Sequence, residues 1–165
     1  MQISEPRQRD QLFSDMNDLD DEDFISPTVR CVLFSLDNET YGINVKKIRE
    51  VLRVGTIRQV PGAPSNVIGV INVRGVIVTV IDTRRLYGLG SKQPDDFSRI
   101  IIVELDEDRA VGLMVDQVRE VKDIPESRVD LMAGREGSGY IQGIAHYQDN
   151  VIILVDTDNM FASSH

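Results

Sequence analysis

The chain has 165 residues, a formal net charge of −9 and no tryptophan. This length suits one compact domain or two small subdomains with an apolar core. The negative charge disfavours nucleic acid, because phosphate binding requires clustered Lys and Arg, and it also disfavours an anionic membrane surface. No secretory signal and no apolar stretch of about 20 residues is found, so we expect a cytoplasmic protein without direct membrane insertion.

The single cysteine, Cys31, lies inside an apolar run and cannot form an intramolecular disulfide. We interpret it as a buried small hydrophobe and not as a reactive thiol. Because aromatic residues are few, the core must consist mostly of Val, Ile and Leu.

Residues 1–27 differ from the rest of the chain. They carry eight Asp and Glu residues against only Arg7 and Arg9. A charge block of this kind predicts a disordered, solvated tail. Its apolar residues leave open a second interpretation, a short helix formed on a partner, because they have helical spacing: Leu12, Phe13, Met16 and Leu19.

The chain after the tail has the pattern of short strands separated by turns. Up to residue 90 it predicts, in order, strands at 29–36 and 40–45 joined by the polar turn 37–39, a short helical turn or an edge strand at 46–52, a loop at 59–64, a turn at 65–68, two strands within 69–83, and a short helical end at 84–90.

The segment 69–83 contains the strongest strand signal. It is interpreted as two strands joined at Arg74-Gly75. The second run is apolar and β-branched at nearly every position, so we expect a strand that is buried on both sides.

The second half of the chain repeats the first. A polar linker at 91–98 is followed by predicted strands at 99–105 and 110–115. The segment 143–157 aligns with 69–83 without a gap, and 116–121 aligns with 46–51. The second copy differs by a longer middle loop, residues 125–139. A repeat at a nearly fixed offset indicates two related β units.

These observations predict an all-β fold of two small barrels with about five strands each. The two halves of the sequence that make up this fold are approximately 28–90 and 97–161, and residues 162–165 are expected to fray. Each barrel would be marginal alone at about 60–70 residues, so we expect the two to share a core along their junction.

Little in the sequence supports an enzyme. His165 is the last residue, and His146 occupies the position that Asn72 fills in the other half. There is no cysteine pair for zinc, and the glycine-rich stretch 134–139 lacks the Lys-Ser/Thr of a phosphate loop. Asp82 recurs as Asp156 after a buried strand, which indicates a turn or cap. We therefore predict no catalytic residue, metal or cofactor.

Residues that break the repeat are freer to serve a function. Arg74-Gly75 is replaced by Gln148-Asp149 in the second half. An Arg beside a Gly exposes its guanidinium for recognition, although an ordinary hairpin turn explains the pair as well. Glu50 is a natural ion-pair partner for Arg74, and it recurs as Glu120.

Several motifs resemble the CheW family of chemotaxis coupling proteins. They are ETYGINV (39–45), IREVL (48–52), VPGAP (60–64), GVINVRG (69–75) and VTVIDTR (78–84), and the match continues from 111–116 to 152–156. The resemblance covers about residues 28–161. It implies two five-stranded Src-homology-3-like barrels around a shared apolar core, with short helices and strands that can be exchanged between the halves.

The resemblance also implies a function without catalysis. Members of the family join the cytoplasmic tip of chemoreceptors to the regulatory domain of the histidine kinase CheA, and further copies of the coupling protein can take part in the array. The residues at positions where the family contacts receptor or kinase are Ile48, Glu50, Val51, Gly69, Arg74 and Gly75. Glu50 and Arg74 match a charged pair of the family.

Some positions depart from the family pattern, and some alternatives stay open. Thr79 and Thr83 stand where many members have Pro and Leu, and we expect them to affect packing only. The loop 131–139 matches poorly, which leaves the kinase contacts of the second barrel open.

Two alternative functions stay open: a coupling protein of a non-flagellar chemosensory pathway and a small-barrel peptide-binding module.

Overall fold

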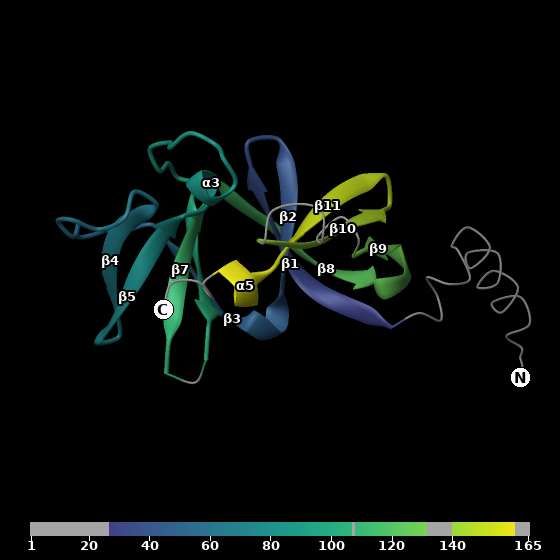
Figure 1. Cartoon of the computed structure of the whole chain (residues 1–165), viewed down its shortest axis with the longest axis horizontal. Helices are drawn as coiled ribbons and strands as arrows, with labels where there is room; N and C mark the ends of the chain where they lie inside the picture. The colour runs from purple at the N-terminus through teal and green to yellow at the C-terminus, as the bar shows by residue number, and fades with distance from the viewer. Residues whose placement is uncertain (1–26, 107, 132–139, 161–165) are drawn as a thin grey trace, which may run out of the picture.

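The computed structural model describes residues 27–106, 108–131 and 140–160, which form two β-sheets with a few short helices (Figure 1). The predictions for the acidic tail, for most of the loop 131–139 and for the frayed C-terminus lie outside the described residues. The predicted all-β class is confirmed.

The first sheet has six strands in the order β8-β1-β2-β11-β10-β9. All of its pairs are antiparallel except the parallel pair of β11 with β2. Its strands are β1 (Thr28–Leu36), β2 (Glu39–Asn44), β8 (Gln117–Pro125), β9 (Val129–Asp130), β10 (Ile141–Tyr147) and β11 (Asn150–Val155).

The second sheet has five strands in the order β3-β6-β7-β5-β4, with one parallel pair, β5 with β7. Its strands are β3 (Ile48–Arg53), β4 (Val67–Val73), β5 (Val76–Asp82), β6 (Arg99–Glu104) and β7 (Ala110–Val115). The short helices are η1 (Val45–Lys47), α3 (Thr83–Leu86), η2 (Glu126–Arg128) and α5 (Thr157–Met160).

Each sheet closes into a barrel because the chain continues from one edge strand to the other. After β3, Arg58 forms a bridge with Val70 of β4 through two backbone hydrogen bonds, with N–O distances of 2.9 and 2.8 Å. In the other sheet, η2 leads from β8 directly to β9, which pairs with β10. With the two-residue strand β9 included, this barrel has six strands. Each barrel contains strands from both halves of the sequence.

The predicted shared core is confirmed. A central cluster takes its side chains from both sheets, including Phe34 and Ile43 from one and Ile101 and Leu113 from the other, all fully buried. Each barrel also has its own interior cluster, around Leu33 in the six-stranded barrel and around Val80 in the five-stranded barrel. The alternation along the strands sends successive side chains into the central and the interior clusters.

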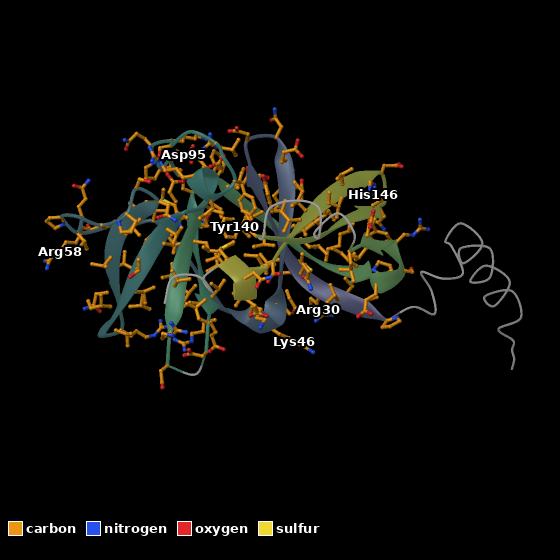
Figure 2. All side chains as sticks on the ribbon, in the orientation of Figure 1. Arg30, Lys46, Arg58, Asp95, Tyr140 and His146 are labelled. Atoms are coloured by element: carbon orange, nitrogen blue, oxygen red, sulfur yellow. The ribbon has the colours of Figure 1, made fainter. Side chains whose placement is uncertain are left out.

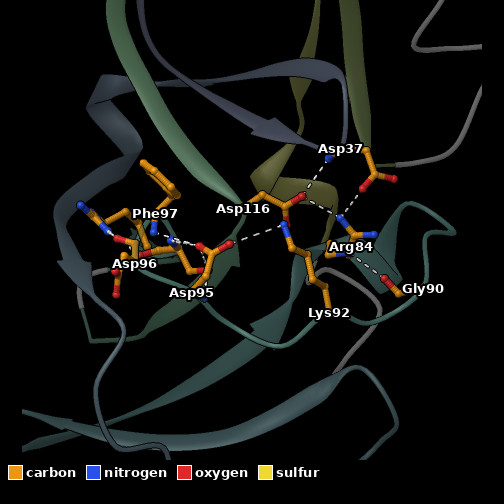
Figure 3. A network of polar contacts seen from close by, with 10 residues as sticks. Asp37, Arg84, Gly90, Lys92, Asp95, Asp96, Phe97 and Asp116 are labelled. Carbon is orange, nitrogen blue, oxygen red and sulfur yellow. Dashed lines mark hydrogen bonds and ion pairs between the residues drawn. The ribbon is translucent and has the colours of Figure 1, made fainter.

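Polar contacts hold the two barrels together as well (Figure 3). Nη1 of Arg84, in α3, lies 2.7 Å from a carboxylate oxygen of Asp37 and 2.7 Å from one of Asp116. Asp116 lies where the chain crosses from β7 to β8, so α3 of one barrel is bound to that crossing and to the β1–β2 turn of the other. The hydrogen bond to Asp37 raises the pKa of the Arg84 guanidinium, so this cation is permanent.

The expectation that the strand after Arg74-Gly75 is buried on both sides is wrong at its start. Val76 is 58% exposed and Ile77 is 63% exposed, whereas Val78 and Val80 are buried. The reason is the unequal overlap of the strands: β7 pairs with β5 only from Thr79 onward, so the first residues of β5 have a neighbour on one side only.

The segment 46–52 combines both predicted alternatives, because η1 ends at Lys47 and β3 begins at Ile48. Its counterpart in the second half has no helical turn, since β8 begins directly after Asp116. The predicted boundaries between the two halves stay a prediction.

Candidate partner-binding site

The turn that joins β4 and β5 has a two-residue geometry with positive φ at both central residues. The φ angles are 50° at Arg74 and 87° at Gly75, as a type I′ hairpin turn requires. The Asn72 side chain stabilises the turn, because its Oδ1 accepts a hydrogen bond of 2.7 Å from the Gly75 N–H. This local chemistry places the Arg74 side chain at the tip of the hairpin.

The structure brings the two predicted charged residues into contact. The guanidinium of Arg74 donates to a carboxylate oxygen of Glu50 in β3. The side chain of Arg74 is 74% exposed, whereas that of Glu50 is 24% exposed. A pair this open to water contributes at most about 1 kcal/mol to folding. Most of the Arg74 side chain therefore remains accessible to another molecule.

The other predicted site residues have different surroundings. Val51 is 39% exposed and follows Glu50 in β3. Gly75 is open, because a Cβ placed there would have no atom within 4 Å. Ile48 is half-buried and packs against the central core. Arg74 and Glu50 thus form one contact, with Gly75 beside it in the turn. Val51 lies on the opposite face of β3 from Glu50, and Ile48 packs against the core.

The fold itself explains why position 69 is a glycine. A Cβ at this position would lie 2.3 Å from the carbonyl oxygen of Arg58, so only glycine permits the bridge that closes the barrel. Gly143 has the same place in the six-stranded barrel, where a Cβ would lie 2.9 Å from the carbonyl oxygen of Asp130. A partner contact at Gly69 stays a prediction.

A groove of about 600 Å³ lies between the barrels, and the sequence analysis did not identify its lining. Most of its lining belongs to the five-stranded barrel, and Tyr140 and Met160 line it from the segment that contains the last strands of the six-stranded barrel. The lining is mainly apolar, with Val76, Ile77 and Ile81 of β5, and it also includes Arg49, Asp108 and Arg109. The sequence did not predict the exposure of Ile77, because the β-branched residues around it have the pattern of a strand that is buried on both sides. No signal in the sequence marks this exposure, because it depends on where β7 begins to pair with β5, at Thr79. Thr79, expected to affect packing only, lines this groove.

Among residues 27–106, 108–131 and 140–160, no group of three His, Cys, Asp or Glu side chains is arranged to hold a metal ion. Cys31 is 1% exposed, and burial raises the pKa of its thiol to about 11. The interpretation of Cys31 as a buried hydrophobe is therefore confirmed. Within the described part of the chain, no helix has the length and apolarity that crossing a membrane requires.

These features define an all-β binding module: two barrels with an apolar groove between them and an exposed Arg74–Glu50 pair at the end of one barrel. The model of the CheW-like domain family matches residues 30–165. The chain belongs to the CheW-like domain family.

Relatives of known name agree with this assignment. The chain is 29% identical to the chemotaxis protein CheW of Klebsiella aerogenes over 140 residues, which cover 80% of this chain and 81% of that protein. It is 30% identical to the chemotaxis protein CheW of Thermotoga maritima over 128 residues, which cover 77% and 83%. The crystal structure of the scaffolding protein TtCheW from Thermoanaerobacter tengcongensis matches with a TM-score of 0.75 and 33% identity, and covers 82% of this chain and 93% of that one.

Proposed function

We propose that this chain is a chemotaxis signalling scaffold without catalytic activity, which couples chemoreceptors to the histidine kinase CheA and transmits receptor state to kinase activity. The observation that carries the proposal is the exposed Arg74–Glu50 pair beside Val51, in a chain of the CheW-like family. The residues proposed to contact partners are Ile48, Glu50, Val51, Gly69, Arg74 and Gly75.

The receptor partner in this proposal is the helical hairpin at the cytoplasmic tip of a chemoreceptor. The groove between the barrels supports it, because its walls carry exposed β-branched side chains such as Ile77 and its length runs along β5. An amphipathic helix binds such a groove through apolar anchors spaced i, i+3 and i+4. The protein would thereby be recruited from the cytoplasm to membrane-associated receptor arrays.

The kinase partner in this proposal is the regulatory domain of CheA. Exposed apolar residues at equivalent positions of the two barrels support pairing at both barrel ends. Val51 corresponds to Val121, with exposures of 39% and 57%. A molecule with two similar patches can extend a ring of alternating partners, in which further copies of this chain can replace the kinase domain. Each contact would be modest and would gain strength through multivalency.

The test is reconstitution of the chain with receptor-containing membranes and CheA from the same organism, measured by co-sedimentation and by kinase activity. Arg74→Ala and Glu50→Ala are compared with the wild type and with Gln148→Ala. Gln148 is a matched control, because it lies in the corresponding hairpin turn of the other barrel with a φ of 54° and its side chain is uncharged. Circular dichroism checks that every variant is folded.

We expect the wild type and Gln148→Ala to form a kinase-active complex, and the two other variants to lose at least tenfold in kinase activation. Loss in all three variants would show that the effect is not specific to the Arg74 turn. A wild type that neither joins the complex nor changes kinase activity would refute the coupling function.

A further inference from the structure

Charge is divided unequally between the two barrels. The described residues of the five-stranded barrel and its connections (45–106 and 108–115) contain eleven Lys and Arg against seven Asp and Glu. The described residues of the six-stranded barrel (27–44, 116–131 and 140–160) contain ten Asp and Glu against four Lys and Arg. Figure 1 places β4 and β5 at the end of the molecule opposite β8 and β9. The molecule therefore has a basic end and an acidic end.

The basic residues gather along the side where the five-stranded barrel closes. We call this side the basic seam: it comprises β3, the 54–66 loop, β4 and the hairpin tip. The Arg58–Val70 bridge and the Arg74–Glu50 pair both cross it. Figure 2 labels Arg58 at the outermost end of this barrel.

Much of the positive charge on the seam is not neutralised within the protein. The side chains of Arg53 and Arg58 make no ion pair with any described residue. Arg53 lies directly opposite Arg99 in the β3–β6 pair, and two cations in this position repel each other. Arg99 turns its guanidinium to backbone carbonyl oxygens instead of a carboxylate. An external anionic group would relieve this repulsion.

The seam also exposes apolar side chains between its cations. Val51 is 39% exposed, Val60 is 44% exposed and Val76 is 58% exposed. The outward face of β3 alternates Arg49, Val51 and Arg53. A ligand that matches this surface combines several carboxylates with a few apolar side chains.

Residues 1–26 of the same chain have this composition. They hold eight Asp and Glu with two Arg, and they carry Leu12, Phe13, Met16 and Leu19 among the acidic residues. They join the protein at the start of β1, which belongs to the acidic six-stranded barrel. Electrostatic repulsion from the acidic barrel and attraction to the basic seam both favour a position of this segment at the seam.

We propose that the basic seam is an intramolecular docking surface for the acidic N-terminal segment, residues 1–26. The length allows it, because 26 residues reach up to about 90 Å when extended, and a folded unit of this size is about 40 Å across. Such a contact is made of exposed ion pairs, so it is weak and salt-sensitive. The contact itself does not depend on the proposed function.

The consequence of the contact rests on the proposed function. The seam includes Val51 and Arg74, which are proposed to meet receptor or kinase. A docked segment covers them, so it competes with partners and lowers the apparent affinity of the free protein. Removing the segment should increase partner affinity about two- to tenfold at low salt, since a tether supplies it at an effective concentration near the millimolar range.

The direct test places a nitroxide on the segment and measures which amide signals it broadens. Ser14→Cys provides the attachment site, and the native Cys31 does not interfere because it is 1% exposed. We expect broadening along β3 and β4, little along β8 to β10, and loss of the effect at about 0.5 M salt, where the screening length falls to a few ångströms. Dilution with unlabelled protein should leave the broadening unchanged.

Two charge-reversal variants provide the comparison. Arg53→Glu with Arg58→Glu changes the seam, and neither residue belongs to the proposed partner site. Arg119→Glu with Lys122→Glu makes the same change of charge on the six-stranded barrel and serves as the control. The first pair should abolish the broadening, and the second should leave it intact.

Three outcomes would overturn the proposal: no broadening on the seam, equal broadening on both barrels, or broadening that disappears on dilution with unlabelled protein, which would show a contact between copies. These outcomes are independent of partner binding. A protein whose segment docks but which does not activate the kinase would refute the proposed function and leave the docking surface standing.

Discussion

Replacing Gly69 by Ala tests how the five-stranded barrel is closed. Gly69 lies in β4 beside the bridge between Arg58 and Val70. The added Cβ would lie 2.3 Å from the carbonyl oxygen of Arg58 and 2.8 Å from its carbonyl carbon. Both are backbone atoms, so no side-chain rotation relieves the clash.

The expected cost follows from these distances. An ordinary contact requires the two segments to separate by about 1 Å, which lengthens the two bridge hydrogen bonds of 2.9 and 2.8 Å beyond bonding distance. Each lost backbone bond costs about 1 kcal/mol, and overpacking strain adds about 1 kcal/mol or more. We expect Gly69→Ala to lower the free energy of unfolding by about 2–4 kcal/mol.

Urea denaturation followed by circular dichroism measures the loss, and two glycines serve as references. Gly143→Ala meets the carbonyl oxygen of Asp130 at 2.9 Å, a smaller overlap, so it should cost about 1 kcal/mol. Gly55→Ala meets no atom within 4 Å and should change stability by less than about 0.5 kcal/mol. If Gly69→Ala is as stable as Gly55→Ala, the bridge that closes the barrel does not require glycine at position 69. A partner contact would then be the remaining explanation for this glycine.

Three further predictions concern two buried groups, Thr83 and Cys31. The Thr83 hydroxyl has no hydrogen-bond partner among the described residues although the residue is 0% exposed, so Thr83→Val should leave stability unchanged or raise it by about 1 kcal/mol in urea denaturation; a clear loss would reveal a partner. Cys31 should resist iodoacetamide in the folded protein at pH 8, and modification at the rate of a free thiol would contradict its burial. Because its folded pKa is about 11 and its ordinary value is 9.0, the native thiol holds its proton where the unfolded thiol has lost it. The free energy of unfolding should therefore fall from pH 9 to pH 11 more steeply in the wild type than in Cys31→Ala.

Much of the fold could be predicted because the chemistry that determines it is local. Strand alternation and turn residues locate most strands within one or two residues, as in β1 and β6. The prediction of a loop at 125–139 is wrong at its start, because β8 extends to Pro125 and β9 covers Val129–Asp130. The repeat predicts two related barrels, since Gly69 and Gly143 have equivalent environments against a closing segment. The shared core follows from the small size of each barrel.

The features that could not be predicted depend on pairing between distant strands. The exposure of Val76 and Ile77 depends on where β7 begins relative to β5, and no residue in β5 itself encodes it. The groove between the barrels is missed for the same reason. The contacts of Arg84 with Asp37 and Asp116 join the helix α3 to two connections that are distant in the sequence, and each residue alone resembles an ordinary cap or loop charge.

The comparison of the two hairpin turns argues that the side chain of Arg74 is not required for its own turn. Gln148 and Asp149 adopt the same positive φ angles, 54° and 63°, without an Arg or a Gly. Backbone geometry therefore tolerates other residues at this position, and the Arg74–Glu50 pair contributes little stability because it is open to water. Glu120, the counterpart of Glu50, is exposed and has no such Arg beside it, since Gln148 stands in that place. The charged pair is thus specific to one barrel, so the proposed partner contact through Arg74 would involve that barrel alone.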